Sequence, residues 1–457
     1  MSKLLFNEFE AVTSKQWKQK IQFDLKGADY NENLIWKTNE DIDVKPFYHS
    51  DEFKDPLTIS NTKATQWQIC QSIFVADTIK SNKKAINAIE RGAESIIFII
   101  PNETISLSRL IENIDTTSIS LYFDLQFLSD KYILQFTDLI NKENIFFHVD
   151  IIGNLAKNGN WFSSLQEDHH KFETIVNQFN TLSIDMSLYQ NAGANMVQQL
   201  AYGMSQANEY LNHFDSTLEK GKKQSIKILF HVSVGTNYFF EIAKLKALRI
   251  LWNTLALEYG FNTQCHIVVI PTKRNKTLYD YNTNMLRTTT ECMSAILGGA
   301  NTVCNLAYDA VYHKNNEFGE RIARNQLLIL KHESYFDKVN NPADGTYYIE
   351  TLTAQLAEKA LELFKKMETK GGLITLLVDG TIQRKINESA QKEQELFDTG
   401  KEVLLGTNKH PNKEDRMKHD LELFPFVKQN ARKTLITPII EKRLAEKLEQ
   451  ERLSLEE

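Results

Sequence analysis

Few residues that could transfer protons stand where this chain would be expected to build a catalytic site. In proteins made of alternating strands and helices, catalytic groups come from the carboxyl ends of the strands and the loops behind them. Those positions hold four charged residues, Asp150, Lys273, Arg274 and Asp309. Proton transfer needs a histidine or paired carboxylates that converge, and these four form no such constellation. We therefore expect each to be a helix cap or a solvated loop charge.

Histidines are the other candidates for chemistry. His148, His231 and His266 lie in apolar runs, whereas His169 and His170 are adjacent in a polar loop. Alternation along the chain indicates that His231 and His266 point into the core, where a hydrogen-bonded histidine is more common than a ligand. Two adjacent histidines do not easily face one ion, and no third ligand is suitably spaced. We expect no metal site.

Eight short apolar runs would have to position these residues. They are rich in Ile, Val and Phe, as strands covered on both faces should be. The runs span residues 67–74, 95–100, 118–125, 145–150, 181–188, 226–235, 265–271 and 300–307. A segment with helical periodicity follows each run. Eight strand–helix units predict an α/β protein with a closed (β/α)8 barrel, the TIM-barrel fold, rather than an open sheet.

Two segments lie outside these units. Residues 1–66 are polar and irregular, and their scattered aromatic side chains predict an extended arm that lies across its own barrel or across a partner. Residues 384–457 predict a C-terminal helical tail, whose last run, 441–457, would be a solvated helix or a tail. The barrel itself is expected over residues 67–383.

Composition narrows the class of protein. A formal net charge of −6, with 42% hydrophobic and 25% charged residues, is typical of a globular protein without a basic nucleic-acid-binding face. The N-terminus has no apolar signal-peptide region, and no window is long and apolar enough for a membrane span. We therefore expect a cytoplasmic protein. The four cysteines form no CxxC pair and are expected to be small buried hydrophobes: Cys70, Cys265, Cys292 and Cys304.

Several long motifs carry a specific family resemblance. They are QNAGA at 190–194, GTNYFFEIAKLKALRILW at 235–252, NMLRTTTECMSAILGGA at 284–300, RIARNQ at 321–326 and NPADGTYYIETLT at 341–353. In this order they resemble the barrel of methylmalonyl-CoA mutase, an adenosylcobalamin-dependent isomerase. The opening segment, residues 5–30, is similar to the small subunit of the bacterial heterodimeric form. The resemblance covers nearly the whole chain.

The sequence departs from the catalytic chain of that family at four places. Before the QxAGA motif, the family carries a Tyr-His pair whose His contacts the thioester carbonyl, and here the two positions are Ser187 and Leu188. Three further segments that meet cobalamin or the CoA ester in the family are replaced here by residues 67–70, 159–173 and 270–278. After residue 384 nothing matches the Asp-x-His-x-x-Gly signature, so the cobalamin domain is expected to be absent.

The resemblance therefore implies a non-catalytic small subunit with no catalytic, cofactor-binding or metal-binding residues of its own. Its partner would be the catalytic large subunit, which would hold adenosylcobalamin and interconvert (R)-methylmalonyl-CoA and succinyl-CoA. The barrel mouth should then be narrower or more filled than a substrate-threaded barrel needs. Two alternatives stay open: a free-standing barrel enzyme that uses Lys273, Asp309 or His231, and a regulatory module that binds CoA esters without catalysis.

Overall fold

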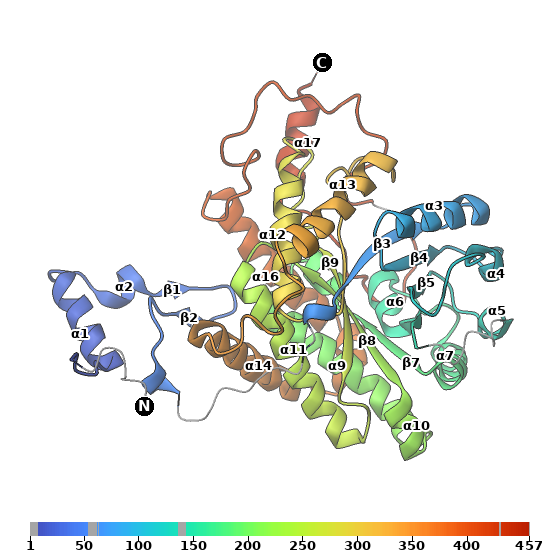
Figure 1. The fold of residues 1–457 in the computed structure, drawn as a ribbon, viewed down its shortest axis with the longest axis horizontal. Helices are drawn as coiled ribbons and strands as arrows, with labels where there is room; N and C mark the ends of the chain where they lie inside the picture. Colours follow the sequence, from blue (N-terminus) through green and yellow to red (C-terminus); the bar gives the residue numbers. More distant parts are fainter. Residues whose placement is uncertain (1–7, 54–61, 63, 136–142, 429–430, 457) are drawn as a thin grey trace.

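The fold is an eight-stranded barrel with a projecting N-terminal arm (Figure 1). The computed structural model describes residues 8–53, 62, 64–135, 143–428 and 431–456. The barrel strands run parallel in the order β6-β5-β4-β3-β10-β9-β8-β7. Their bounds are β3 Gln68–Phe74, β4 Ser95–Ile100, β5 Ser120–Leu125, β6 Ile145–His148, β7 Thr181–Asp185, β8 Lys227–Val234, β9 Cys265–Pro271 and β10 Thr302–Cys304. The predicted barrel of eight strands is confirmed.

Alternate residues of the barrel strands enter two separate apolar clusters, as a barrel requires, except that β7 contributes only to the larger one. In β4, for example, Ile96, Phe98 and Ile100 belong to the large cluster that the strands share with the surrounding helices. Ile97 lies between them in sequence and instead packs in a second cluster inside the barrel. The members of this inner cluster are Cys70, Ile97, Tyr122, Phe146, Leu229, Val268 and Cys304, with Ile99 and Ile270 packed against it.

Most of the helices after the arm surround the barrel on its outer face, whereas the last one lies beyond one end of it (Figure 1). Their bounds are α3 Thr78–Glu90, α4 Leu107–Leu110, α5 Asp130–Ile133, α6 Ile151–Asn158, α7 Leu165–Phe179, α8 Ser187–Asn191, α9 Met196–Asp215, α10 Lys220–Ser225, α11 Tyr238–Tyr259, α12 Thr283–Leu297, α13 Glu317–Leu328, α14 Tyr347–Glu368, α15 Gly372–Val378, α16 Thr381–Asp398 and α17 Glu446–Ser454. Among the described residues, no helix combines the length and apolarity that crossing a bilayer requires.

Side chains rather than a backbone ladder close the barrel between β6 and β7. In the described part of the chain, seven ladders join the eight strands. At the remaining seam, the Ser183 hydroxyl accepts from Val149 N–H at 3.0 Å and donates to Val149 C=O at 2.9 Å. Asp185 N–H donates to the Asp150 carboxylate at 2.8 Å. The seam therefore depends on the identity of two polar side chains, Ser183 and Asp150.

The arm consists of α1 Ser14–Asp24, α2 Tyr30–Leu34 and a small hairpin of β1 Trp36–Lys37 and β2 Asp43–Val44. The hairpin contacts the barrel, because Asn195 at the start of α9 donates to Asn39 C=O at 3.0 Å and Trp36 packs edge-on against Phe240. In contrast, α1, which the structure describes over its whole length, buries none of its residues.

Two sequence-based expectations about local structure are wrong. The fifth strand ends at Asp185 rather than at residue 188, because the Asp185 carboxylate accepts from Ser187 N–H at 2.8 Å and turns the chain into α8. The last run is only partly solvated: Glu449 of α17 is fully buried, where it pairs with Arg443 at 2.6 Å and accepts from Leu278 N–H at 2.8 Å. Alternation and composition do not reveal such side-chain contacts between distant segments.

Candidate functional site

The axis of the barrel is filled by side chains from opposite strands. The rings of Tyr122 and Phe146 stack with centroids 4.9 Å apart, and His266 lies 5.0 Å from Phe146. The Tyr122 hydroxyl is 2.8 Å from His266 Nε2 and 2.8 Å from Thr302 Oγ1. His266 is therefore a hydrogen-bonded histidine that points into the barrel, as the sequence predicts, and it is half-buried. Burial lowers its pKa to about 3, so the imidazole is neutral at neutral pH.

A polar layer lies next to these side chains on the barrel axis, toward the carboxyl ends of the strands. The strand register places Asp124 of β5 beside His148 of β6, and Asp185 of β7 beside His231 of β8. The two imidazole rings lie 3.9 Å apart between centroids, and both histidines are buried. His148 Nδ1 and His231 Nε2 have no hydrogen-bond partner among the described residues. The sequence-predicted histidines therefore meet, but they meet each other inside the barrel.

Burial controls the protonation of this polar layer. It lowers the pKa of His231 to about 3, and the neighbouring His148 acts in the same direction. It raises the pKa of the Asp124 carboxyl to about 6. Burial also opposes ionisation of Asp185, but His148, His231 and the hydrogen bond from Ser187 outweigh it and hold that pKa below its usual value. An imidazole with a pKa near 3, as in His231, is a poor general acid or base at neutral pH.

Asp150 is a structural carboxylate at the same end of the barrel. It is the N-cap of α6, as expected, and accepts from Gly153 N–H at 2.8 Å. It also accepts from Tyr210 Oη at 2.5 Å, Gln206 Nε2 at 2.6 Å and Asp185 N–H at 2.8 Å. Burial raises its pKa to about 6, although these donors oppose the shift. Four hydrogen-bond donors thus occupy both carboxylate oxygens of Asp150, so its role is structural.

Ser187 and Leu188, the two positions that depart from the catalytic pattern, begin α8. Leu188 is only 4% exposed and belongs to the main apolar core. Ser187 is half-buried, and its N–H donates a hydrogen bond to the Asp185 carboxylate. An aliphatic side chain at position 188 therefore contributes to packing. The predicted run 181–188 puts Leu188 at the end of the fifth strand, and that placement is wrong because the residue lies in α8.

A C-terminal strap, residues 434–446, crosses the carboxyl end of the barrel. Ile436 N–H donates to Gly159 C=O at 3.1 Å and Ile439 N–H to Ala156 C=O at 2.8 Å, both after β6. Further along, Lys442 N–H donates to Asn191 C=O at 3.1 Å, after β7. Leu444 N–H donates to Arg274 C=O at 2.9 Å, after β9. Backbone hydrogen bonds thus fix the strap across the loops where a TIM barrel usually carries its catalytic groups.

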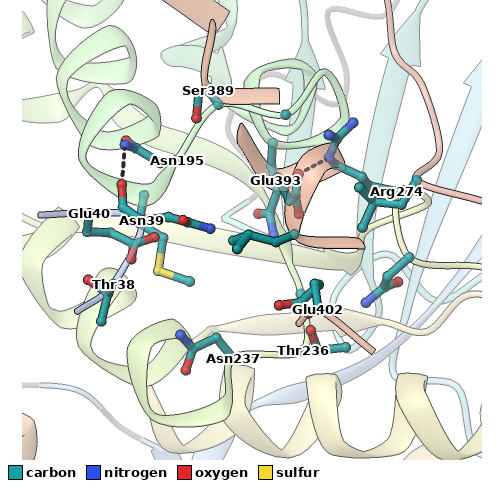
Figure 2. A pocket seen from close by; sticks show the side chains of 18 of the residues that line it. Thr38, Asn39, Glu40, Asn195, Thr236, Asn237, Arg274, Ser389, Glu393 and Glu402 are labelled. Carbon is teal, nitrogen blue, oxygen red and sulfur yellow. Dashed lines mark hydrogen bonds and ion pairs between the residues drawn. The ribbon is translucent and has the colours of Figure 1, made fainter. Parts of the chain in front are cut away.

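A cavity of about 480 Å³ lies beside the Gln190–Ala194 loop, and Figure 2 shows its polar lining. The arm hairpin contributes Thr38, Asn39 and Glu40, and α16 contributes Ser389 and Glu393 (Figure 2). Its described lining includes no histidine and no cysteine. Burial raises the pKa of the Glu40 carboxyl, and Thr38 and Met196 N–H oppose that rise through hydrogen bonds. Polar groups are present, but no nucleophile–base pair is.

The remaining charged candidates are dispersed. Arg274 faces this cavity, where its Nε pairs with Glu393 at 2.5 Å and its Nη1 donates to Lys442 C=O at 2.8 Å (Figure 2). Arg274 is buried, so the expected solvated charge is wrong for this residue. Lys273 is exposed, as expected. Asp309 is also buried and accepts from Asn316 Nδ2 at 2.7 Å in the loop after β10.

The adjacent histidines and the cysteines show no arrangement for metal chemistry. His169 lies on α7 with Nδ1 2.8 Å from Leu165 C=O, and His170 is exposed. Over the described ranges, no group of three or more His, Cys, Asp or Glu residues is arranged to hold a metal ion. All four cysteines are free and buried, as their apolar sequence context predicts.

Sequence reasoning missed two kinds of charged residue inside the fold. Asp124 and Asp185 were overlooked, although each lies within a predicted strand run, 118–125 or 181–188. The buried ion pairs Lys244–Glu241, 2.6 Å, and Lys276–Glu291, 2.8 Å, were also missed. A signal existed for the first pair, because the two residues stand three apart on the same helix, the spacing at which side chains meet.

Comparison with known proteins identifies the family. A sequence model of the family described as "Methylmalonyl-CoA mutase" matches residues 147–456. The chain is 31% identical over 449 residues to a protein of Porphyromonas gingivalis named "Methylmalonyl-CoA mutase small subunit", covering 89% of this chain and 71% of that protein. This chain belongs to the methylmalonyl-CoA mutase family. The resemblance inferred from the five motifs is confirmed.

Other members of the methylmalonyl-CoA mutase family match only part of the chain. The mutase of Cereibacter sphaeroides is 36% identical over 244 residues, which are 51% of this chain and 33% of that protein. The "Methylmalonyl-CoA mutase large subunit" of Propionibacterium freudenreichii subsp. shermanii is 29% identical over 247 residues, or 53% of this chain and 33% of that protein. The chain thus matches about a third of the length of these two mutases.

Proposed function

We propose that this chain is the small, non-catalytic subunit of a two-chain methylmalonyl-CoA mutase. Its partner, a catalytic large subunit, would bind adenosylcobalamin and interconvert (R)-methylmalonyl-CoA and succinyl-CoA in the cytoplasm. In this proposal, residues 67–383 form a barrel whose active site has been lost, residues 1–66 form a partner-binding arm and residues 384–457 form a tail that covers the barrel. The names of relatives as small and large subunits support two chains.

The filled barrel axis is the observation on which the non-catalytic role rests. Tyr122 and Phe146 of the neighbouring strands β5 and β6 stack inside the barrel, and Tyr122 reaches across it to His266 of β9. They join an apolar cluster that includes Leu229 and Val268. A CoA ester that reached through the barrel would have to displace these side chains. Close packing makes such displacement costly, because buried apolar side chains lose their contacts when they move.

The residues at the carboxyl end also do not fit adenosylcobalamin. A protein ligand for cobalt must present an imidazole nitrogen toward the corrin, but His148 and His231 are buried against each other. The strap is bonded to the loops after β6, β7 and β9. We therefore assign no cofactor-binding residue to this chain and derive no catalytic step from it.

Exposed apolar residues on the arm support a protein partner. Trp17 is 49% exposed and Phe23 is 79% exposed, and both lie on α1, which stands away from the barrel in Figure 1. Large aromatic side chains at a subunit interface contribute more binding energy than most other residues. A second chain that covers α1 would remove these rings from water.

The alternative that the chain is a free-standing barrel enzyme requires a catalytic site built from Lys273, Asp309 or His231. These residues lie in different surroundings: an exposed loop, the buried Asn316 contact and the barrel interior. No observation favours this alternative or the regulatory CoA-ester module over the small-subunit proposal.

Reconstitution tests the proposed function. The purified chain should show no mutase activity with methylmalonyl-CoA and adenosylcobalamin. Addition of the proposed catalytic large subunit should give an active complex in which the two chains co-elute. Turnover by the lone chain would contradict the non-catalytic role. Failure of the two folded chains to associate would contradict the proposed partnership.

Restoring the family's Tyr-His pair should not restore chemistry. The double variant Ser187→Tyr/Leu188→His is expected to remain inactive without the partner, because the other ligand-contacting segments are still absent. It should also lose about 1–3 kcal/mol of unfolding free energy, since an imidazole without a partner replaces the buried Leu188. Urea unfolding and a methylmalonyl-CoA assay measure the two effects, with Leu188→Met as the packing control. Detectable conversion by the double variant would show that a near-functional site survives.

A further inference from the structure

A basic groove lies on the outer face of the barrel, between α3 and α13. Its cavity measures about 300 Å³, and Gln71 of β3 forms part of its lining. Five of the lining side chains are cationic and two are anionic, which leaves an excess of three positive charges in a chain whose net charge is −6. The cations are Lys83, Lys84, Arg91, Arg321 and Arg324.

The deepest cation is fixed by neutral partners. Arg324 is 6% exposed, its Nε donates to Arg91 C=O at 3.2 Å, and its Nη1 donates to the Gln71 side-chain oxygen. Burial lowers the pKa of this guanidinium, and the adjacent charge of Arg91 acts in the same direction, while Glu320 opposes it. A buried charge is normally paired, yet here cations surround it.

The carboxylates of the groove do not balance these charges. Glu320 is paired with Lys84 and also accepts from Gln71 Nε2 at 3.1 Å. Glu317 lies in the first turn of α13, at the rim. Within the described part of the chain, Lys83, Arg91 and Arg321 form no ion pair, and the guanidinium of Arg321 lies 5.4 Å from the centre of the Phe318 ring. Their positive charges remain available to a ligand.

We propose that this groove binds a phosphate or pyrophosphate group. Guanidinium forks match phosphate oxygens in paired hydrogen bonds, and a dianion would offset more of the excess charge than a single carboxylate. Lys83 and Arg91 approach from α3, and Arg321 and Arg324 approach from α13. The group could be inorganic or belong to a phosphorylated metabolite. This site is independent of the barrel interior and of the proposed subunit role.

Calorimetric titration of the whole chain with inorganic phosphate and with pyrophosphate, in low-salt buffer, tests the site. Arg321→Ala and Lys83→Ala should each weaken binding by about tenfold, as expected for loss of one charge-assisted hydrogen bond. Both residues are exposed, so the variants should fold. Arg384→Ala is the matched control, because it removes an exposed guanidinium from α16.

Unchanged affinity in Arg384→Ala, with weaker binding in the two groove variants, would support the proposal. Equal weakening in all three would show non-specific attraction to positive charge and overturn it. Failure of both phosphate and pyrophosphate to bind would overturn it as well. Adenosine monophosphate then distinguishes the sources: tighter binding than inorganic phosphate indicates a phosphorylated metabolite, and weaker binding indicates that the groove takes the inorganic ion.

Discussion

Replacement of Lys244 by methionine is expected to lower the free energy of unfolding by about 3–5 kcal/mol. Lys244 is 1% exposed and pairs with Glu241 at 2.6 Å. It also donates to Gln190 Oε1 at 2.8 Å, Ser233 C=O at 2.8 Å and Gln199 Oε1 at 3.0 Å. Its loss leaves the Glu241 carboxylate buried without a cation. Burial lowers the pKa of the Lys244 ammonium and Glu241 opposes the shift, so both charges depend on each other.

Urea unfolding of matched variants isolates this effect. Lys366→Met removes a lysine from an exposed pair with Glu362 on α14 and should cost less than about 0.5 kcal/mol. The double variant Lys244→Met/Glu241→Gln should recover part of the loss, because glutamine keeps an acceptor for Gly235 N–H without a buried charge. If Lys244→Met were no more damaging than Lys366→Met, the pair would not support the barrel in the way described.

Replacement of Asp150 by alanine should cost about 3 kcal/mol or more. The change removes the α6 cap and leaves the donors of Tyr210, Gln206 and Asp185 N–H without their acceptor. Each buried donor left unpaired costs about 1–3 kcal/mol, and loss of an N-cap costs about 1 kcal/mol. Thermal or urea unfolding measures the loss.

The variant Asp77→Ala measures what a helix N-cap contributes to stability without the tertiary hydrogen bonds that Asp150 also makes. Asp77 caps α3 by accepting from Lys80 N–H at 2.7 Å, but it is exposed. Its loss should therefore cost only about 1 kcal/mol. Equal losses in the two variants would mean that the hydrogen bonds of Asp150 to Tyr210 and Gln206 contribute nothing measurable.

The barrel could be predicted from sequence because its physical basis is local. Strands buried on both faces need apolar residues at consecutive positions, and SIIFII at 95–100 becomes β4 with the predicted bounds. The strand ends were less predictable. β7 stops at Asp185 because one carboxylate accepts from Ser187 N–H, and hydrophobic alternation carries no signal for that contact.

The polar layer inside the barrel was only half visible in the sequence. His231 was recognised as inward-pointing, but its neighbours depend on register. β7 and β8 align Asp185 with His231, and the curvature of the sheet brings His148 against the same ring. The burial of Glu449 has the same origin, since its partner Arg443 and the backbone of Leu278 approach only in the folded chain.

The seam between β6 and β7 makes this barrel a curled sheet with two free edges that a hydroxyl and a carboxylate fasten together. Opening this seam requires the rotation of one or two side chains. Separating two strands that are joined by a ladder requires the loss of several backbone hydrogen bonds together. The cylinder should therefore loosen first along one longitudinal line. A point substitution could also widen the barrel. A larger or apolar residue at position 183 would separate β6 from β7 without disturbing the seven ladders between the other strands.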